Sequence, residues 1–429
     1  MKVAFCALGC KVNQYEADCY AQLFKQRGYE ISSFDEKCDV YVINTCSVTN
    51  IGERKSRQMI RRARKMNPSA VIAVTGCYAQ VKTAEIKNMP EADVVIGTSG
   101  RHLICDLVEA VMRGENAEHC SDIMKERAYE EMECAGETER TRAYIKIEDG
   151  CNNFCSYCII PYARGPVRSR RPENVLAEAV RLAKNGFCEL VLTGISISSY
   201  GRDLEENITL GDIINRVSET DGIERVRLGS IDPRIFDNDF ITLLAANEKV
   251  CRQFHISLQS GSAGVLSRMN RKYTPEQYLS VVEKIRRAMP DAAITTDIIC
   301  GFPGETDSEF EETKEFVRKA RFARVHVFPY SEREGTAAAK MKQLNKEVRE
   351  KRAKELFEIT ENIRAEFEES FIGSTHGVLF EQSADGVSEG LTKNYLRIYV
   401  NSEKPLDSEL HPVKITGREN GRLTGTLAD

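Results

Sequence analysis

The sequence predicts an α/β protein with three folded parts: a doubly wound parallel sheet, a partial (β/α)6 barrel and a small antiparallel β-barrel. Three observations support this. Short apolar runs alternate with helical patterns up to about residue 130, and the same alternation continues from residue 142 to about 340. After residue 371, short strand-like segments and an Asn-Gly pair at 420–421 replace it. Apolar strands separated by helices are typical of parallel sheets, and Asn-Gly is typical of hairpin turns.

The N-terminal part, residues 1–130, is predicted to hold a parallel sheet. Its strand candidates are residues 2–8, 39–44, 70–75 and 93–97. Helical patterns follow them near residues 14–27 and 47–65 and from about residue 82. Such an order gives a doubly wound sheet covered by helices. The polar, acidic stretch 129–141 is predicted to be a linker.

The central part, residues 141–340, is predicted to form an open barrel. Its six strand candidates are residues 143–147, 189–193, 225–229, 254–258, 294–299 and 324–328. Two helix starts between them are marked by capping boxes, Thr274 with Gln277 and Thr306 with Glu309. Six strand–helix units are too few to close an eight-stranded barrel, so a partial (β/α)6 barrel is expected.

The C-terminal part changes character twice. Residues 341–370 carry a charged amphipathic pattern that predicts a linker helix over 345–370. Residues 371–429 contain strand candidates at 376–381, 395–401 and 412–417, and the Asn-Gly turn follows the last of them. A small antiparallel barrel of the OB-like type is expected there.

Composition excludes several classes of protein. The net charge of the 429 residues is −5, so nucleic-acid contact would depend on local basic patches rather than on bulk charge. No apolar run approaches the roughly 18 residues of a membrane span, and the N-terminus does not resemble a signal peptide. We therefore expect a cytoplasmic protein with no membrane partner. In a reducing cytosol its 15 cysteines would serve metal or redox chemistry rather than disulfides.

One cysteine motif is compact. Cys151, Cys155 and Cys158 form a C-x3-C-x2-C pattern directly after the first strand of the central part. Cysteine thiolates at such close spacing hold iron–sulfur clusters, and three thiolates on a four-iron cluster leave one iron open. The alternatives are a structural zinc site that lacks its fourth ligand, or three incidental cysteines.

Three further cysteines stand at predicted strand ends. Cys10, Cys46 and Cys77 follow the first, second and third strands of the N-terminal sheet. The carboxyl ends of parallel strands share one edge, where ligands bind, so these thiols can converge. Gly9 and Gly76 precede two of them and would let a bulky group approach the backbone. The alternative is three buried structural cysteines.

The C-x3-C-x2-C motif followed by βα units resembles the radical S-adenosylmethionine (SAM) family. That resemblance implies SAM bound at the open iron and cleaved reductively to methionine and a 5′-deoxyadenosyl radical. The stretches ALGCKVNQYE, VINTCSVTN, VTGCYAQ, CNNFCSYCIIPYARGPVRSR and TDIICGFPGET are similar to the methylthiotransferases within that family. This resemblance covers the whole chain. It implies two [4Fe-4S] clusters, an auxiliary one on Cys10, Cys46 and Cys77 and a radical-generating one on Cys151, Cys155 and Cys158, and a C-terminal TRAM-type RNA-binding barrel.

The same resemblance implies a SAM site across the strand ends of the central part. Its residues would be Tyr157 beside the adenine, Thr193 and Gly194 at the amino group, and Gln259 and Ser260 near the ribose. His255 and His326 lie inside predicted strands and are interpreted as barrel lining.

RNA contact is predicted from basic patches. Arg54, Arg57, Arg61 and Arg64 share one face of the helix after Cys46, and Arg168 follows the second cysteine motif together with Arg164, Arg170 and Arg171. The alternative for the helix is a solvated face. In the C-terminal barrel, Tyr395 and Tyr399 are candidates for base stacking.

The resemblance is strongest to the MtaB-type branch, which modifies N6-threonylcarbamoyladenosine beside the tRNA anticodon. It implies an anticodon stem-loop as partner and a flavodoxin-type electron donor; we expect a monomer. Two substrates remain as alternatives, isopentenyladenosine in tRNA and an aspartate of a ribosomal protein. An alternative of another class is a non-catalytic iron–sulfur sensor that binds RNA.

Overall fold

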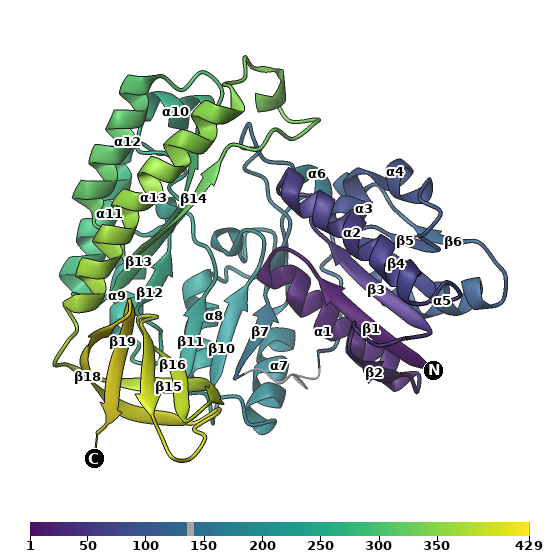
Figure 1. Ribbon diagram of the computed structural model, residues 1–429, viewed down its shortest axis with the longest axis horizontal. Coiled ribbons are helices and arrows are strands. Elements are labelled where there is room, and N and C mark those ends of the chain that lie inside the picture. Colours follow the sequence, from purple (N-terminus) through teal and green to yellow (C-terminus); the bar gives the residue numbers. More distant parts are fainter. Residues whose placement is uncertain (135–140, 429) are drawn as a thin grey trace.

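The computed structural model describes residues 1–134 and 141–428 and confirms the predicted fold class (Figure 1). Residues 135–140 of the predicted linker lie outside the described residues. None of the helices described is both long and apolar enough for a membrane-crossing segment.

The N-terminal part is a six-stranded, fully parallel sheet in the order β2-β1-β3-β4-β5-β6. The predicted strands are β1 (Lys2–Ala7), β3 (Val40–Thr45), β4 (Val71–Gly76) and β5 (Val94–Ile96). The edge strands β2 (Glu30–Ser32) and β6 (Ala117–His119) were not predicted, because each has three residues and little apolar character. Its helices are α1 (Lys11–Gln26), α2 (Asn50–Met66), α3 (Cys77–Val81), α4 (Thr83–Lys87) and α5 (Ile104–Met112).

The direction in which strands are added reverses between β1 and β3. The chain passes from β1 to its neighbour β2 on one side and then returns to place β3 on the other side. Every residue of β3 and β4 is buried, as expected for strands covered by helices on both faces. Ligands in open α/β sheets bind outside the carboxyl ends of strands at such a reversal.

The central part is an arc of six parallel strands made of two sheets. One sheet holds β7 (Arg142–Lys146), β10 (Glu189–Thr193) and β11 (Arg225–Leu228), and the other holds β12 (Gln253–His255), β13 (Ala293–Cys300) and β14 (Arg324–Pro329). Only single parallel bridges, such as Ile231 with Ile256, join β11 to the region of β12. The predicted open barrel is thus confirmed.

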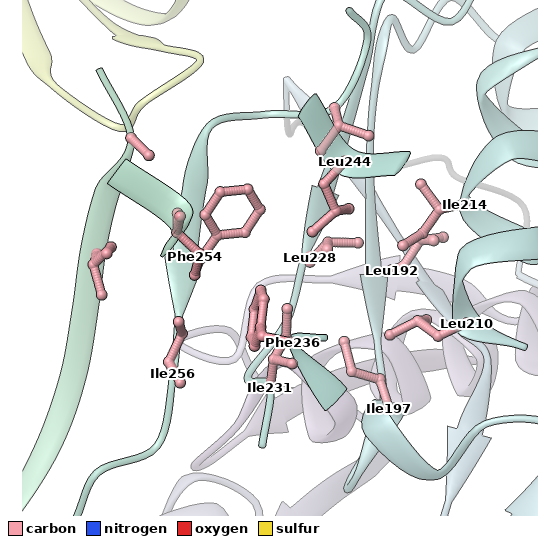
Figure 2. Close-up of a cluster of buried hydrophobic side chains, with 14 of the residues drawn as sticks. Leu192, Ile197, Leu210, Ile214, Leu228, Ile231, Phe236, Leu244, Phe254 and Ile256 are labelled. Carbon is pink, nitrogen blue, oxygen red and sulfur yellow. The ribbon is translucent and has the colours of Figure 1, made fainter. Parts of the chain in front are cut away.

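The helices of the arc cover its outside and form one core with it. They are α7 (Pro172–Lys184), α8 (Leu210–Ser218), α9 (Asn238–Ala246), α10 (Ala263–Arg268), α11 (Pro275–Ala288) and α12 (Asp307–Ala320). Both predicted capping boxes are present, at Thr274 and Thr306. Figure 2 shows Leu192, Leu228 and Phe254 from successive strands packed together. Each such fully buried side chain stabilises the fold by about 1.5–3 kcal/mol relative to an exposed one.

The C-terminal part begins with α13 (Lys346–Glu369), which packs along β14 (Figure 1). A closed barrel follows, in the order β15 (Thr375–Ala384), β16 (Val387–Thr392), β17 (Arg397–Asn401), β19 (Arg422–Leu427) and β18 (Leu410–Glu419). The predicted turn has left-handed backbone at Asn420 and Gly421. One detail differs from the expectation, because β17 and β19 are parallel. A closed ring with an odd number of strands cannot alternate in direction throughout.

The small barrel is docked on the central arc by arginines of β11. The guanidinium of Arg225 donates to the carbonyls of Leu391 and Gly377, at 2.9 and 2.7 Å. The ring of Tyr395 lies 4.8 Å from the guanidinium of Arg227 and 5.6 Å from that of Arg142. These two contacts make Tyr395 an interdomain anchor. The ring also lines a cavity beside the small barrel, so its role in base stacking stays a prediction.

Candidate active site

The first cysteine trio lies at the strand reversal of the N-terminal sheet. Cys10 caps α1 after β1, Cys46 directly follows β3, and Cys77 begins α3 after β4. A Cβ added to Gly9, at φ +97°, would lie 2.7 Å from the Cys46 sulfur. One added to Gly76, at φ +95°, would lie 2.2 Å from Asn44 Oδ1. Both glycines are therefore required by close contacts with protein atoms; that they admit a bulky group, as the sequence suggested, stays a prediction.

Asn13 ties two of these strand ends together. Its Nδ2 donates to the Leu8 carbonyl at 2.7 Å and to the Thr45 carbonyl at 3.0 Å. Burial, together with the nearby Cys10 and Cys46 sulfurs, raises the pKa of Cys77 to about 12. The three thiols thus lie within electrostatic reach of one another.

The second trio occupies the loop between β8 (Glu148–Asp149) and α6 (Ile160–Arg164). This loop is fixed by backbone hydrogen bonds, from Cys151 N to the Gly165 carbonyl at 3.0 Å and from Ser156 N to the Met269 carbonyl at 3.0 Å. Arg271 Nη1 donates to the Cys155 sulfur at 3.3 Å. Burial raises the pKa of Cys158 to about 12.

Neither trio brings its three sulfur atoms within 4.8 Å of one another, as a single metal ion would require. Four thiolates around one zinc ion would stand about 3.8 Å apart, given Zn–S bonds of about 2.3 Å. Among the described residues, the one group of three metal-ligating side chains whose ligand atoms all lie within 4.8 Å is His255, Asp297 and His326. Wider separation suits thiolates that bind different irons of one cluster. Because the pKa values of these thiols are raised, the thiols would release protons when they bind a metal or a cluster.

A cavity of about 250 Å³ is lined by Cys158 and by residues that follow Cys46 in the sequence. Val48 and Thr49, just after Cys46, line one side of it, and Tyr157 and Cys158 line another. The rest of its wall is mostly apolar and includes Ile299, Phe328 and Tyr330. A molecule in this cavity would touch elements that carry both sets of cysteines.

Two of the five predicted SAM residues line this cavity. They are Tyr157, whose ring packs edge-on against Phe302, and Gln259, whose backbone has an unusual φ of +73°. Thr193 and Gly194 lie elsewhere, and the Gly194 backbone packs against Glu148. Ser260 is fully buried, and its hydroxyl pairs with that of Thr313 at 3.3 Å.

Sequence reasoning missed a polar cluster on the barrel strands. His255 Nε2 lies 3.2 Å from Asp297 Oδ2, and its Nδ1 lies 3.1 Å from Thr295 Oγ1. Asp297 itself lines the cavity. The two histidines were correctly placed inside strands, but their meeting at Asp297 depends on the register of β12, β13 and β14, which the sequence does not show.

The predicted RNA-binding arginines fall into three groups. Arg54 and Arg61 are exposed on α2, as expected. Arg57 donates to the Tyr78 hydroxyl at 2.8 Å, and Arg64 pairs with Asp93 at 2.6 Å. The prediction for Arg168 was wrong. This residue is 2% exposed, because its guanidinium donates to the Arg164 and Pro166 carbonyls, so no phosphate can reach it.

Comparison with known families agrees with this geometry. Residues 145–317 match the radical SAM superfamily, and residues 2–97 match the uncharacterized protein family UPF0004. The fold is similar to that of the radical S-adenosylmethionine methyltransferase TsrM from Kitasatospora setae, with a TM-score of 0.57 and 16% identity over 79% of this chain and 75% of that one.

Relatives of known name cover nearly the whole chain. The threonylcarbamoyladenosine tRNA methylthiotransferase MtaB of Bacillus subtilis is 41% identical over 96% of this chain and 93% of its own length. The protein of the same name from Aquifex aeolicus is 39% identical over 93% of this chain and 96% of its own. A tRNA-2-methylthio-N(6)-dimethylallyladenosine synthase of Clostridium botulinum is 36% identical over 97% and 95%. This chain is therefore an enzyme that belongs to the radical SAM methylthiotransferase family.

Proposed function

We propose that this enzyme converts N6-threonylcarbamoyladenosine beside the tRNA anticodon to its 2-methylthio derivative. The observation that carries the proposal is the cavity lined both by Cys158 of the second trio and by Val48 and Thr49, which closely follow Cys46 of the first. The two MtaB relatives at 41% and 39% identity favour this nucleoside over others. Adenine C2 would receive the sulfur, and SAM would serve both as radical source and as methyl donor.

Cys151, Cys155 and Cys158 are proposed to hold the radical-generating [4Fe-4S] cluster. When bound, that cluster supplies the electron that cleaves SAM. Tyr157 and Gln259 line the cavity next to Cys158 and would border SAM, and the apolar wall would keep water away from the reacting atoms. Thr193, Gly194 and Ser260 remain second candidates, since they stand at strand ends outside this cavity.

Cys10, Cys46 and Cys77 are proposed to hold an auxiliary [4Fe-4S] cluster that handles sulfur. The close packing of Gly9 on Cys46 and the nearness of the Cys10 and Cys46 sulfurs to Cys77 support this assignment. Iron analysis of the reconstituted enzyme tests it. Cys46→Ala and Cys155→Ala should each lose about half of the wild-type iron, and the double variant should lose nearly all of it.

The tRNA is proposed to contact both ends of the protein. Arg54 and Arg61 on α2 lie exposed after Cys46. A second cavity of about 210 Å³, where α13 and β14 meet the small barrel, is lined by Arg324, Arg422 and Tyr399. Arg324 and Arg422 are exposed, and the Arg422 guanidinium lies 4.9 Å from the Tyr399 ring. Such arginines suit phosphates of an anticodon stem-loop.

The remaining assignments are the electron donor, the oligomeric state and the compartment. A flavodoxin-type donor is proposed as the reductant, and the enzyme is proposed to act as a monomer in the cytoplasm, where tRNA is modified.

Mass spectrometry of tRNA nucleosides from cells with and without the gene tests the proposal. Loss of 2-methylthio-N6-threonylcarbamoyladenosine with accumulation of its precursor is expected. Loss of the dimethylallyl derivative instead would assign the enzyme to the branch of its Clostridium botulinum relative. An unchanged nucleoside profile would refute a tRNA substrate and leave the ribosomal protein and the sensor as alternatives.

A further inference from the structure

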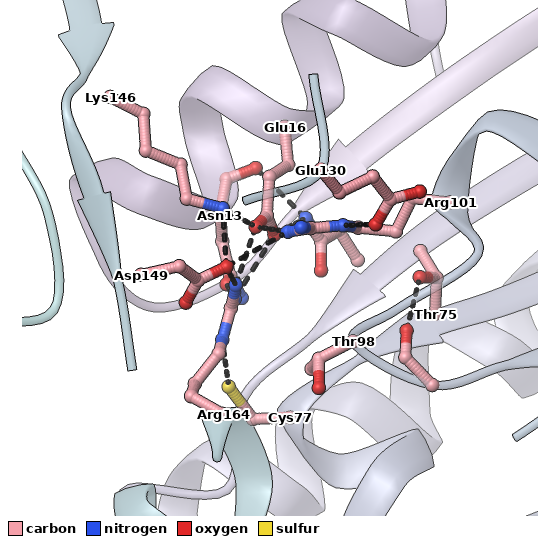
Figure 3. Close-up of polar contacts among 12 residues, drawn as sticks. Asn13, Glu16, Thr75, Cys77, Thr98, Arg101, Glu130, Lys146, Asp149 and Arg164 are labelled. Atoms are coloured by element: carbon pink, nitrogen blue, oxygen red, sulfur yellow. Dashed lines mark hydrogen bonds and ion pairs between the residues drawn. The ribbon is translucent and has the colours of Figure 1, made fainter. Parts of the chain in front are cut away.

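A buried network of charged groups joins the N-terminal and central parts behind the first cysteine trio (Figure 3). Glu16 and Arg101 come from the N-terminal part, and Lys146, Asp149 and Arg164 come from the central part. All five are at most 1% exposed. Arg164 ends α6, the short helix that directly follows the second cysteine motif.

The network contains one more positive charge than negative charges. The side chains of Arg101, Lys146, Arg164 and Arg168 face three carboxylates, those of Glu16, Glu130 and Asp149. Glu130 pairs with Arg101, and Glu16 and Asp149 each pair with at least three of the four cations. A buried excess charge is costly unless an anion lies beside it.

The guanidinium of Arg164 brings a positive charge of this network into contact with the first trio. Its Nε donates to the Cys77 sulfur at 3.2 Å, and its Nη2 donates to Asn13 Oδ1 at 2.7 Å. Asn13 is the side chain that ties the ends of β1 and β3 together. The guanidinium of Arg164 is fully buried, so this geometry is held by protein on every side.

We propose that Arg164 is a positioning residue for the auxiliary cluster, which it makes easier to reduce by donating a charged hydrogen bond to the Cys77 sulfur. The proposal rests on the proposed function, because it requires a cluster on Cys10, Cys46 and Cys77. Reduction adds negative charge to a cluster, and hydrogen bonds and positive charge at its sulfurs stabilise that charge. Since Arg164 belongs to the central part, the auxiliary cluster gains its reduced-state stability only while the two parts are docked.

The experiment uses the full-length chain with Cys151, Cys155 and Cys158 replaced by alanine, so that only the auxiliary trio can be loaded. After anaerobic reconstitution, the midpoint potential is measured by a redox titration followed by electron paramagnetic resonance. Arg164→Gln is compared with Arg101→Gln. The control removes a cation from the same network and touches no sulfur.

Arg164→Gln should lower the ratio of reduced to oxidised cluster at a given potential by about tenfold, which corresponds to about 59 mV for one electron. Arg101→Gln should lower it clearly less. Arg164→Lys keeps a buried cation and should fold, but its single ammonium will pair with Glu16 and Asp149 rather than reach Cys77, so it too should lower the ratio.

The outcomes separate this proposal from the one it rests on. A parent chain that binds no iron would refute the auxiliary cluster and this proposal together. A parent that binds iron, with a potential that Arg164→Lys or a folded Arg164→Gln leaves unchanged, would refute only the role of Arg164. An equal drop in the Arg101→Gln control would show that the network acts by bulk charge and would overturn the hydrogen bond to Cys77.

Discussion

Gly9→Ala should prevent the first cysteine trio from binding its proposed iron–sulfur cluster without unfolding the N-terminal sheet. An L-residue in the left-handed region costs about 1–2 kcal/mol. The new Cβ would also lie 2.7 Å from the Cys46 sulfur and 2.8 Å from its Cβ, so Cys46 must move. Overpacking of that kind costs about 1–3 kcal/mol. The sum is about 2–5 kcal/mol, concentrated on one proposed ligand.

Gly28→Ala is the matched control, because Gly28 has a φ of +80° and a Cβ there meets nothing within 4 Å. It should therefore show the backbone cost alone, about 1–2 kcal/mol. The assay is thermal unfolding of both variants together with their iron content after reconstitution. Gly9→Ala should lose about half of the iron and Gly28→Ala none. Equal loss of stability with full iron in both variants would refute the argument that Gly9 makes room for Cys46.

Three further predictions concern other parts of the molecule. Burial raises the pKa of the fully buried Glu148, so its carboxyl favours the folded state only while protonated, and that stability is lost as the pH rises above about 4.5. Glu148→Gln should therefore stabilise the chain more at pH 8 than at pH 5, by up to about 1.4 kcal/mol per pH unit; equal unfolding midpoints at both would contradict this. Tyr395→Ala removes two cation–π contacts, about 1–3 kcal/mol in total, and should speed release of the C-terminal barrel in limited proteolysis. Replacing Arg324 and Arg422 by glutamine should weaken the salt dependence of anticodon stem-loop binding. The slope of log K against log salt concentration should become shallower by about 0.7–0.9 per lost phosphate contact, whereas an unchanged slope would place the RNA elsewhere.

The sequence predicted what local pattern determines. The strands β3 and β4, the two capping boxes and the Asn-Gly turn all depend on neighbouring residues, and each was found. The edge strands β2 and β6 carry no such pattern, because their pairing with β1 and β5 rather than their own residues makes them strands. The three cysteines of the second trio come from one loop, so the sequence could predict that they lie together.

The arginines show where sequence reasoning had to stop. Arg164, Arg168, Arg170 and Arg171 were grouped as a basic patch that follows the second cysteine motif. Arg171 is exposed, yet the other three are at most 4% exposed. Partners distant in sequence bury them: Arg164 binds Glu16, and Arg170 binds Glu131. A run of arginines in the sequence shows where positive charge lies along the chain. Only the fold shows which carboxylates and sulfurs each arginine contacts.

The two trios therefore differ in how the fold holds their cysteines together. The second is set by one loop, so Cys151, Cys155 and Cys158 stay together wherever that loop goes. The first is set by three strand ends, by two glycines that admit close contact, and by Asn13 and Arg164, which tie those ends to the central part. Breaking a buried ion pair by removing one partner costs about 3–5 kcal/mol, so changes at this interface should disturb the first trio before the second. Loss of the first trio's iron at an intact second trio is thus the expected signature of a weakened interface.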